Sequence, residues 1–200
     1  MTANENRWDK LLQIKTSGRD DSKADQNCYP YEPSPYSVLE RLANRGLICK
    51  KDVVLDYGCG KGRVDFFLTY QTKAHTIGVE YDERMYQSAL ENRKTAVSGA
   101  KTKFVWSRAE AYEVPQEVNR CYFFNPFSVE ILREVMKRIV ESHDKNPRDM
   151  LLFFYYPSEE YLSYLLTVEE LEFYDEIDCD DLFEVYDMRE QIVVFSLPSE

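Results

Sequence analysis

The sequence lacks the features of a secreted or membrane-spanning protein. Its first residues, Met1 to Arg7, contain no apolar region of the kind found in secretory signals. No apolar run approaches the roughly 18 residues that a membrane-spanning helix requires. The five cysteines are scattered, and none forms a C-x-x-C pair. We therefore expect a cytoplasmic protein with reduced thiols.

Metal-binding and nucleic-acid-binding patterns are missing as well. The two histidines, His75 and His143, have no partner at zinc spacing, so we expect no metal site. The 36 acidic residues outnumber the 25 basic ones, for a net charge of −11. Because proteins that bind DNA or RNA usually carry a basic surface, this balance argues against a nucleic-acid partner.

The acidic residues are concentrated late in the chain. Between Ser158 and Glu190 there are thirteen acids and one base, Arg189, so the rest of the chain is nearly neutral. An acidic region can steer a basic substrate or partner toward a protein. It can equally be a solvated surface that maintains solubility, and the sequence leaves both explanations open.

Glycine is scarce, yet three of the seven glycines fall in one short stretch. The apolar residues 53–55 and Asp56 predict a buried strand, and Gly58, Gly60 and Gly62 follow it directly. Glycine adopts positive φ without strain and lets a ligand approach the backbone. A helix that begins near Arg63 would point its first N–H groups at that ligand. The stretch therefore predicts a nucleotide-type binding turn.

The spacing of the glycines distinguishes between two kinds of nucleotide. A dinucleotide site has the pattern G-x-G-x-x-G, whose third glycine would fall on Arg63. The pattern here is G-x-G-x-G, and Asp56 precedes it by two residues, which favours a ligand with a positive charge at the loop. A nicotinamide-dependent dehydrogenase is thus the weaker alternative.

This stretch resembles motif I of the class I S-adenosylmethionine-dependent methyltransferases. The resemblance implies that the loop holds the methionine part of S-adenosylmethionine and that S-adenosylhomocysteine is the product. The stretch 76–82 is similar to the second strand of that family, where Glu80 would accept both ribose hydroxyls and Tyr81 would stack on the adenine. The implied cofactor contacts in these two regions are Asp56, Tyr57, Gly58, Cys59, Gly60, Gly62, Arg63, Glu80 and Tyr81.

The region after the third expected strand departs from the family pattern. The family often has Gly-Asp-Ala near the adenine, whereas this chain has Ser107-Arg108-Ala109-Glu110. Ala109 would contact the ring. Arg108 occupies the usual position of the acid, and Glu110 follows two residues later. We expect Arg108, Ala109 and Glu110 to lie near the adenine.

A second motif follows the fourth expected strand. Asn125-Pro126-Phe127-Ser128 resembles the Asn-Pro-Pro-Tyr motif of methyltransferases that act on amine or planar nitrogens. The resemblance implies that the Asn125 oxygen and the Pro126 carbonyl accept hydrogen bonds from the target NH₂. It also places Asn125 beside the methyl group of the cofactor. Phe127 replaces the second proline and would cover the substrate or the sulfonium. The alternative is a turn that ends the strand, with Ser128 as a helix cap.

Alternating strands and helices predict an α/β fold. We expect strands at 52–57, 76–80, 102–106, 121–124 and 150–155, and helices capped by Ser34, Asp82 and Ser128. Segments 182–188 and 191–197 should form an antiparallel hairpin. Together with the resemblance, this predicts a Rossmann-like, doubly wound, mostly parallel seven-stranded sheet with helices on both faces.

The expected organisation is one methyltransferase domain over residues 35–200. Residues 1–34 would form a partly mobile segment that covers the cofactor, with one or two helical turns around Trp8. Tyr29 and Tyr31 either line the entrance or pack under the sheet, and Tyr156 is a further candidate for substrate contact.

The leading interpretation is an enzyme that methylates a nitrogen of a protein side chain or a small amine. An O- or C-methyltransferase of the same fold is the second possibility. A regulatory module that binds the cofactor without turnover is the third. The oligomeric state is left open.

Overall fold

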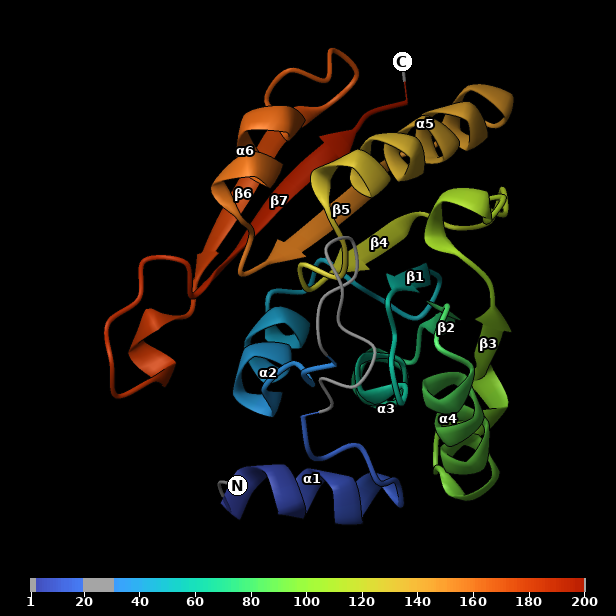
Figure 1. Cartoon of the computed structure of the whole chain (residues 1–200), viewed down its shortest axis with the longest axis vertical. Helices are drawn as coiled ribbons and strands as arrows, with labels where there is room; N and C mark the ends of the chain where they lie inside the picture. The colour runs from blue at the N-terminus through green and yellow to red at the C-terminus, as the bar shows by residue number, and fades with distance from the viewer. Residues whose placement is uncertain (1–2, 20–30, 200) are drawn as a thin grey trace.

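A twisted seven-stranded sheet forms the centre of the molecule (Figure 1). The computed structural model describes residues 3–19 and 31–199. The strands are β1 (Val53–Tyr57), β2 (His75–Glu80), β3 (Thr102–Trp106), β4 (Arg120–Phe123), β5 (Met150–Tyr155), β6 (Glu172–Asp178) and β7 (Gln191–Leu197). Their order is β3-β2-β1-β4-β5-β7-β6; the first five are parallel, and β6 and β7 are antiparallel. The predicted mostly parallel sheet is confirmed.

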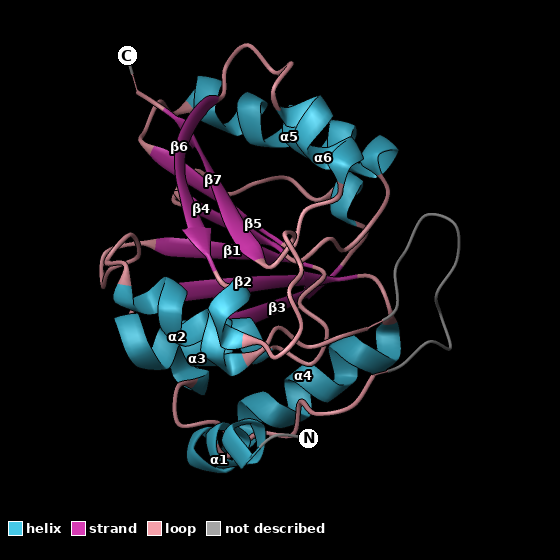
Figure 2. Cartoon of the chain, turned by 90° about the vertical axis from the view of Figure 1, so that its left-hand side faces the viewer, coloured by secondary structure: helices cyan, strands magenta, loops and turns pink. Residues whose placement is uncertain are grey.

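Helices cover both faces of the sheet (Figure 2). One face carries α1 (Ala3–Leu12), α2 (Tyr36–Asn44), α3 (Arg63–Thr72) and α4 (Glu83–Thr95), and the other carries α5 (Val129–Lys145) and α6 (Glu159–Leu165). Short 3₁₀ turns occur at η1 (Gly99–Lys101), η2 (Ala109–Ala111) and η3 (Asp180–Leu182). All six residues of β5 are buried, because neighbouring residues of a strand face opposite sides and both sides are covered.

The strand order reverses between β1 and β4. From β1 the chain builds outward through β2 and β3, and it then returns to place β4 and β5 on the other side of β1. In open α/β sheets this reversal leaves a crevice beyond the carboxyl ends of the two central strands. The glycine loop follows β1, and the Asn125-Pro126 motif follows β4.

The predicted position of the strand that pairs with β7 is wrong. The sequence suggested 182–188, whereas the partner is β6, and residues 179–190 form a connection that contains η3. Because β6 is an edge strand, it tolerates exposed side chains, and only Ile177 is buried. Its acidic sequence therefore lacks the alternation by which a strand is recognised. Val185 and Met188, which suggested a strand, are 78% and 74% exposed.

The start of α2 also differs from the prediction. Ser34 does not cap the helix; its Oγ lies 3.0 Å from the hydroxyl of Tyr122, and Pro35 occupies the cap position. The N–H of Tyr36 instead donates to Glu5 Oε1 at 3.0 Å. The capping acceptor thus comes from α1, a separate helix, so no local pattern could reveal it.

The other helix starts lie close to their predicted positions. Asp82 caps α4 by accepting a hydrogen bond from the N–H of Arg84 at 2.8 Å. Ser128 occupies the cap position of α5 without a side-chain bond. The helix α1 has ten residues, which is more than the one or two turns expected. Within the described residues, no helix has the combined length and apolarity needed to cross a lipid bilayer.

Candidate active site

A cavity of about 490 Å³ opens at the carboxyl ends of β1, β2 and β4. Its volume falls within the range of small-molecule sites, roughly 300–1,000 Å³. It occupies the crevice where the strand order reverses, so motifs more than sixty residues apart in the sequence meet there. The predicted site residues that line it are Tyr31, Asp56, Tyr57, Gly58, Cys59, Arg63, Glu80, Tyr81, Arg108, Ala109, Glu110, Asn125, Pro126 and Phe127.

Two loop glycines lie behind the cavity wall instead of lining it. A Cβ on Gly60 would sit 2.2 Å from the ring of Tyr31, so this ring rests directly on the loop. A Cβ on Gly62 would sit 2.6 Å from Phe104, in the core beneath α3. Both have positive φ, 54° and 84°. Their role is to allow close packing of the loop.

Two predicted substrate contacts are not placed at the cavity by the structure. The hydroxyl of Tyr156 donates to Asp187 at 2.6 Å, and the guanidinium of Arg189 lies 4.0 Å from its ring centroid. Tyr156 does not line the cavity. Tyr29 lies outside the described residues.

Gly58 lies where the glycine loop contacts the Asn125-Pro126 turn. Its N–H and that of Cys59 donate to the carbonyl of Val79 on β2, at 2.9 and 3.1 Å. A Cβ on Gly58 would lie 2.6 Å from the side chain of Pro126. Glycine at this position therefore lets the loop after β1 touch the turn after β4.

Glu80 fixes the glycine loop from the end of β2. Its Oε2 accepts a hydrogen bond from the N–H of Gly60 at 2.9 Å, and its Oε1 accepts one from the N–H of Asp82 at 2.8 Å. Burial raises the pKa of Glu80, although both backbone donors oppose this shift. The backbone of Tyr81 opposes the shift as well. Because a carboxylate has about four acceptor positions, capacity remains for a ligand hydroxyl.

A second carboxyl group lies behind Asp56. Asp65, on α3, is fully buried, and neither of its carboxylate oxygens has a hydrogen-bond donor among the described residues. Burial, with a smaller contribution from the charge of Glu80, raises the pKa of Asp56 to about 7. Burial and the charge of Asp56 raise the pKa of Asp65 well above its usual range. We therefore expect the two groups to share a proton near neutral pH.

Sequence analysis did not select Asp65. The signal was present, because this acid interrupts the apolar run 64–68 of α3, all of which is buried. A carboxyl group in such a run must either face a polar partner or remain protonated. The partner, Asp56, became evident only from the structure.

Asp65→Asn should flatten the pH dependence of stability. Unfolded aspartates titrate near pH ~4, whereas in the folded chain the pKa of Asp56 is raised to about 7 and the pKa of Asp65 is raised well above its usual range. Folded protein thus binds more protons across this window, so stability falls as the pH rises from ~4 through ~7. An amide at position 65 would donate to Asp56 and remove this slope. Urea unfolding at several pH values measures it, with the exposed Asp144→Asn as control. Parallel profiles for native chain and Asp65→Asn would contradict the shared proton.

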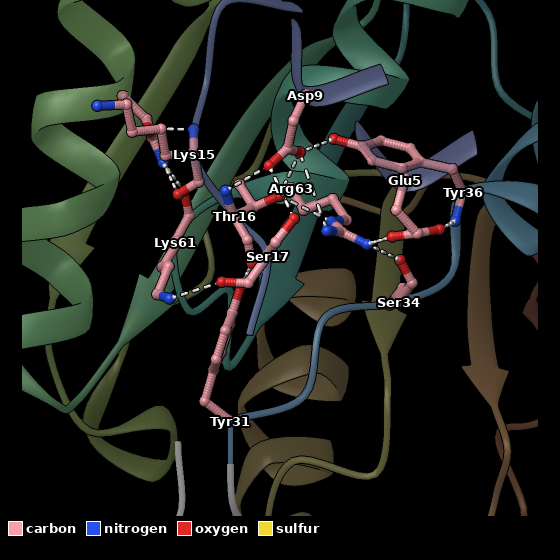
Figure 3. A network of polar contacts seen from close by, with 11 residues as sticks. Glu5, Asp9, Lys15, Thr16, Ser17, Tyr31, Ser34, Tyr36, Lys61 and Arg63 are labelled. Carbon is pink, nitrogen blue, oxygen red and sulfur yellow. Dashed lines mark hydrogen bonds and ion pairs between the residues drawn. The ribbon is translucent and has the colours of Figure 1, made fainter. Parts of the chain in front are cut away.

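Arg63 stands at the first turn of α3 with a guanidinium that is only 3% exposed. Its Nε donates to Thr16 Oγ1 at 2.8 Å, and its Nη1 contacts Glu5 and the carbonyl of Ser34 (Figure 3). Its Nη2 is buried and has no hydrogen-bond partner among the described residues. A buried donor in a cavity wall is suited to a ligand with an anionic group.

Asn125 has a buried hydrogen-bond acceptor without a partner among the described residues, whereas Arg63 has a buried donor without one. It follows β4 with φ of 43°, a left-handed conformation that asparagine tolerates better than most residues. The residue belongs to the cavity wall, and its Oδ1 is buried and has no donor among the described residues. An unsatisfied buried acceptor costs about 1–3 kcal/mol, so its retention is explained if a ligand supplies the donor.

Phe127 forms part of the wall beside Asn125. Its ring is nearly buried and packs edge-on against Tyr57 and Phe123, with 6.4 Å between centroids in both pairs. Its backbone carbonyl accepts a hydrogen bond from the hydroxyl of Tyr161 at 2.6 Å. These contacts fix the backbone of the motif against α6.

Arg108, Ala109 and Glu110 form the opposite rim, in and before η2. Arg108 and Glu110 form an exposed ion pair at 3.4 Å. The N–H of Ser107 donates to the carbonyl of Glu80 at 3.0 Å, which aligns this rim with the end of β2. Within the described residues, no three His, Cys, Asp or Glu side chains are grouped to hold a metal ion.

Comparison with known proteins agrees with this geometry. Residues 48–145, just under half of the chain, match the family described as methyltransferase domain. The chain has the fold of a class I methyltransferase. The matched segment contains the glycine loop, Glu80 and Asn125.

Two solved structures illustrate the shared fold. An RNA methyltransferase from Salinibacter ruber in complex with S-adenosyl-L-homocysteine has a TM-score of 0.59 and 15% identity, over 84% of this chain and 95% of that one. A precorrin-6y C5,15-methyltransferase from Geobacter metallireducens has a TM-score of 0.60 and 13% identity, over 94% and 100%. At such identities the likeness concerns the fold alone.

A curated relative is more similar in sequence over a shorter stretch. A protein-lysine N-methyltransferase from Saccharolobus islandicus is 32% identical over 72 residues. The match covers 35% of this chain and slightly less than half, 45%, of that protein.

Proposed function

We propose that this protein is an S-adenosylmethionine-dependent methyltransferase that acts on a nitrogen of a protein side chain or small amine. The family match and the fold support methyl transfer. The observation that carries the choice of nitrogen is the buried Oδ1 of Asn125, a residue of the cavity wall, which has no donor among the described residues. The partial similarity to a protein-lysine N-methyltransferase points in the same direction.

The residues of the cavity fit the cofactor. Arg63 Nη2 is a buried donor with no hydrogen-bond partner among the described residues, and the carboxyl group of Asp56 belongs to the same cavity wall. They match the carboxylate and the ammonium of an amino acid. The remaining acceptor capacity of Glu80 matches a ribose hydroxyl. Tyr81 and Ala109 line the cavity where an adenine would lie.

The charge of the cavity favours cationic ligands. Seven acids line it, against three arginines, which are Arg63, Arg84 and Arg108. When bound, S-adenosylmethionine supplies a methyl group activated by a sulfonium. An amine also arrives largely as a cation, and it must lose a proton to water before its lone pair can attack. The new nitrogen–methyl bond would replace the sulfur–methyl bond, with S-adenosylhomocysteine as the leaving group.

The chain contributes orientation to the reaction. The Asn125 oxygen and the Pro126 carbonyl accept the N–H bonds of the amine, which leaves the lone pair directed at the methyl group. The left-handed turn at Asn125 and the contact of Pro126 with Gly58 hold this acceptor pair against the glycine loop. Phe127 contributes a rigid wall.

A labelling experiment tests the proposed function. The purified protein is incubated with tritiated-methyl S-adenosylmethionine and, separately, with a lysine-rich protein, a small primary amine or a structured RNA. We expect label in the protein or the amine, and mass spectrometry should place one added methyl group on nitrogen. Label found solely in RNA, or on oxygen or carbon, would overturn the choice of acceptor. Failure to bind S-adenosylhomocysteine would overturn the methyltransferase proposal itself.

A further inference from the structure

A polar network joins the N-terminal helix to the turn that follows it (Figure 3). Its centre is Asp9 of α1, which is 9% exposed. The Asp9 carboxylate accepts hydrogen bonds from the N–H and Oγ1 of Thr16 at 2.8 and 2.6 Å. It also accepts from Ser17 Oγ at 3.2 Å and from the hydroxyl of Tyr36 at 2.6 Å. One buried acid thus fixes the turn at residues 16–17.

The same turn accepts hydrogen bonds from three residues in or next to the glycine loop. Thr16 Oγ1 accepts from Arg63 Nε at 2.8 Å, and the Thr16 carbonyl accepts from the hydroxyl of Tyr31 at 2.6 Å. The Ser17 carbonyl accepts from Lys61 Nζ at 3.3 Å. Arg63 and Tyr31 line the cavity, and the Tyr31 ring rests on Gly60. Asp9 itself does not line the cavity.

These contacts fix the position of the Arg63 guanidinium group. An arginine side chain has several rotatable bonds, and fixing it before a ligand arrives removes part of the cost of binding. Thr16 and Glu5 hold two of its nitrogens, and Asp9 Oδ1 lies 3.9 Å from the third, Nη2. Nη2 is buried and makes no hydrogen bond to any described residue, so it is the nitrogen whose acceptor a ligand would supply.

We propose that Asp9 is a positioning residue of this site: it orients Arg63 and Tyr31 through the 16–17 turn, and so builds a subsite for the α-carboxylate of the ligand. The inference rests on the proposed function, because that carboxylate belongs to the methionine part of S-adenosylmethionine. The N-terminal helix is thereby a component of the binding site, although it lies more than forty residues before the glycine loop.

Two ligands separate this role from a merely structural one. S-adenosylhomocysteine has the amino-acid carboxylate, whereas methylthioadenosine has the same adenosine and thioether without it. Asp9→Ala should weaken S-adenosylhomocysteine binding roughly three- to tenfold and leave methylthioadenosine binding unchanged. Arg63→Gln should weaken the former about tenfold or more, since a charge-assisted hydrogen bond is lost. Adding Asp9→Ala to Arg63→Gln should not change the difference between the two ligands further, because the carboxylate is recognised through Arg63 in both cases.

Two further variants distinguish a specific effect on the subsite from a general loss of stability. Thr16→Val keeps both charges but removes the Oγ1 that bridges Asp9 and Arg63, so it should reproduce the ligand difference. Glu40→Ala releases Trp8 and Asn4, on the same helix, without touching this network. It should lower the melting temperature and leave both affinities unchanged.

Calorimetric titration of the full chain gives the decisive comparison. If Asp9→Ala and Thr16→Val weaken the binding of both ligands equally, the positioning role is overturned. It is also overturned if Glu40→Ala changes the two affinities as much as Asp9→Ala does. If the native chain binds neither ligand, the proposed function fails first. If it binds both with similar affinity and Arg63→Gln changes neither, only the carboxylate subsite fails.

Discussion

Asn125→Ala is expected to lower the rate of methyl transfer by a factor on the order of 10², while S-adenosylhomocysteine affinity stays within a few-fold of native. The Asn125 oxygen is buried and has no donor among the described residues, and under the proposed function an acceptor amine would supply its missing partner. Aligning the nucleophile affects the reaction more than the binding of the cofactor. The measurement is kcat on the acceptor identified by the labelling experiment, with calorimetry for the cofactor.

The backbone at Asn125 requires its own control. Its φ of 43° costs an ordinary residue about 1–2 kcal/mol, so alanine disturbs the turn as well as the chemistry. Asn125→Gly retains the conformation and removes the side chain, and it should be as slow as Asn125→Ala. If the glycine variant transfers methyl groups at the native rate, Asn125 is a turn residue and the nitrogen proposal loses its main support.

Glu80→Ala is expected to weaken S-adenosylhomocysteine binding by a factor of roughly 10². A charge-assisted hydrogen bond to the ribose, worth about 1.5–3 kcal/mol, would be lost. In addition, the N–H groups of Gly60 and Asp82 would lose their acceptor, which loosens the glycine loop. Calorimetry measures the affinity, and circular dichroism checks that the fold survives.

Glu80→Gln separates the two functions of this side chain. The amide keeps one oxygen and therefore one backbone bond, but it cannot accept from two hydroxyls in the same way. We expect an intermediate affinity. Exposed Glu83→Ala, on the first turn of α4, is the matched control and should bind as the native chain does. Native affinity in Glu80→Ala would remove Glu80 from the site.

Much of the site could be predicted because its residues lie in local patterns at strand ends. The loop from Asp56, the acid at Glu80 and the turn at Asn125 each follow a short apolar run. Parallel strands present their carboxyl ends at one edge of a sheet, so three such patterns must meet once the strands align. The glycines reinforced the prediction, since positive φ in a loop restricts the residue type.

The sequence by itself determined the α/β class, the parallel core strands and the motifs that line the cavity. Only the tertiary structure decided which segments distant in sequence complete them. The edge strand β6 carries no alternation because one of its sides faces solvent. Glu5 caps α2, Asp65 pairs with Asp56, and Asp9 orients Arg63 across gaps of many residues. Each of these contacts depends on the packing of α1, α2 and α3 on one face of the sheet, and no local residue pattern encodes that packing.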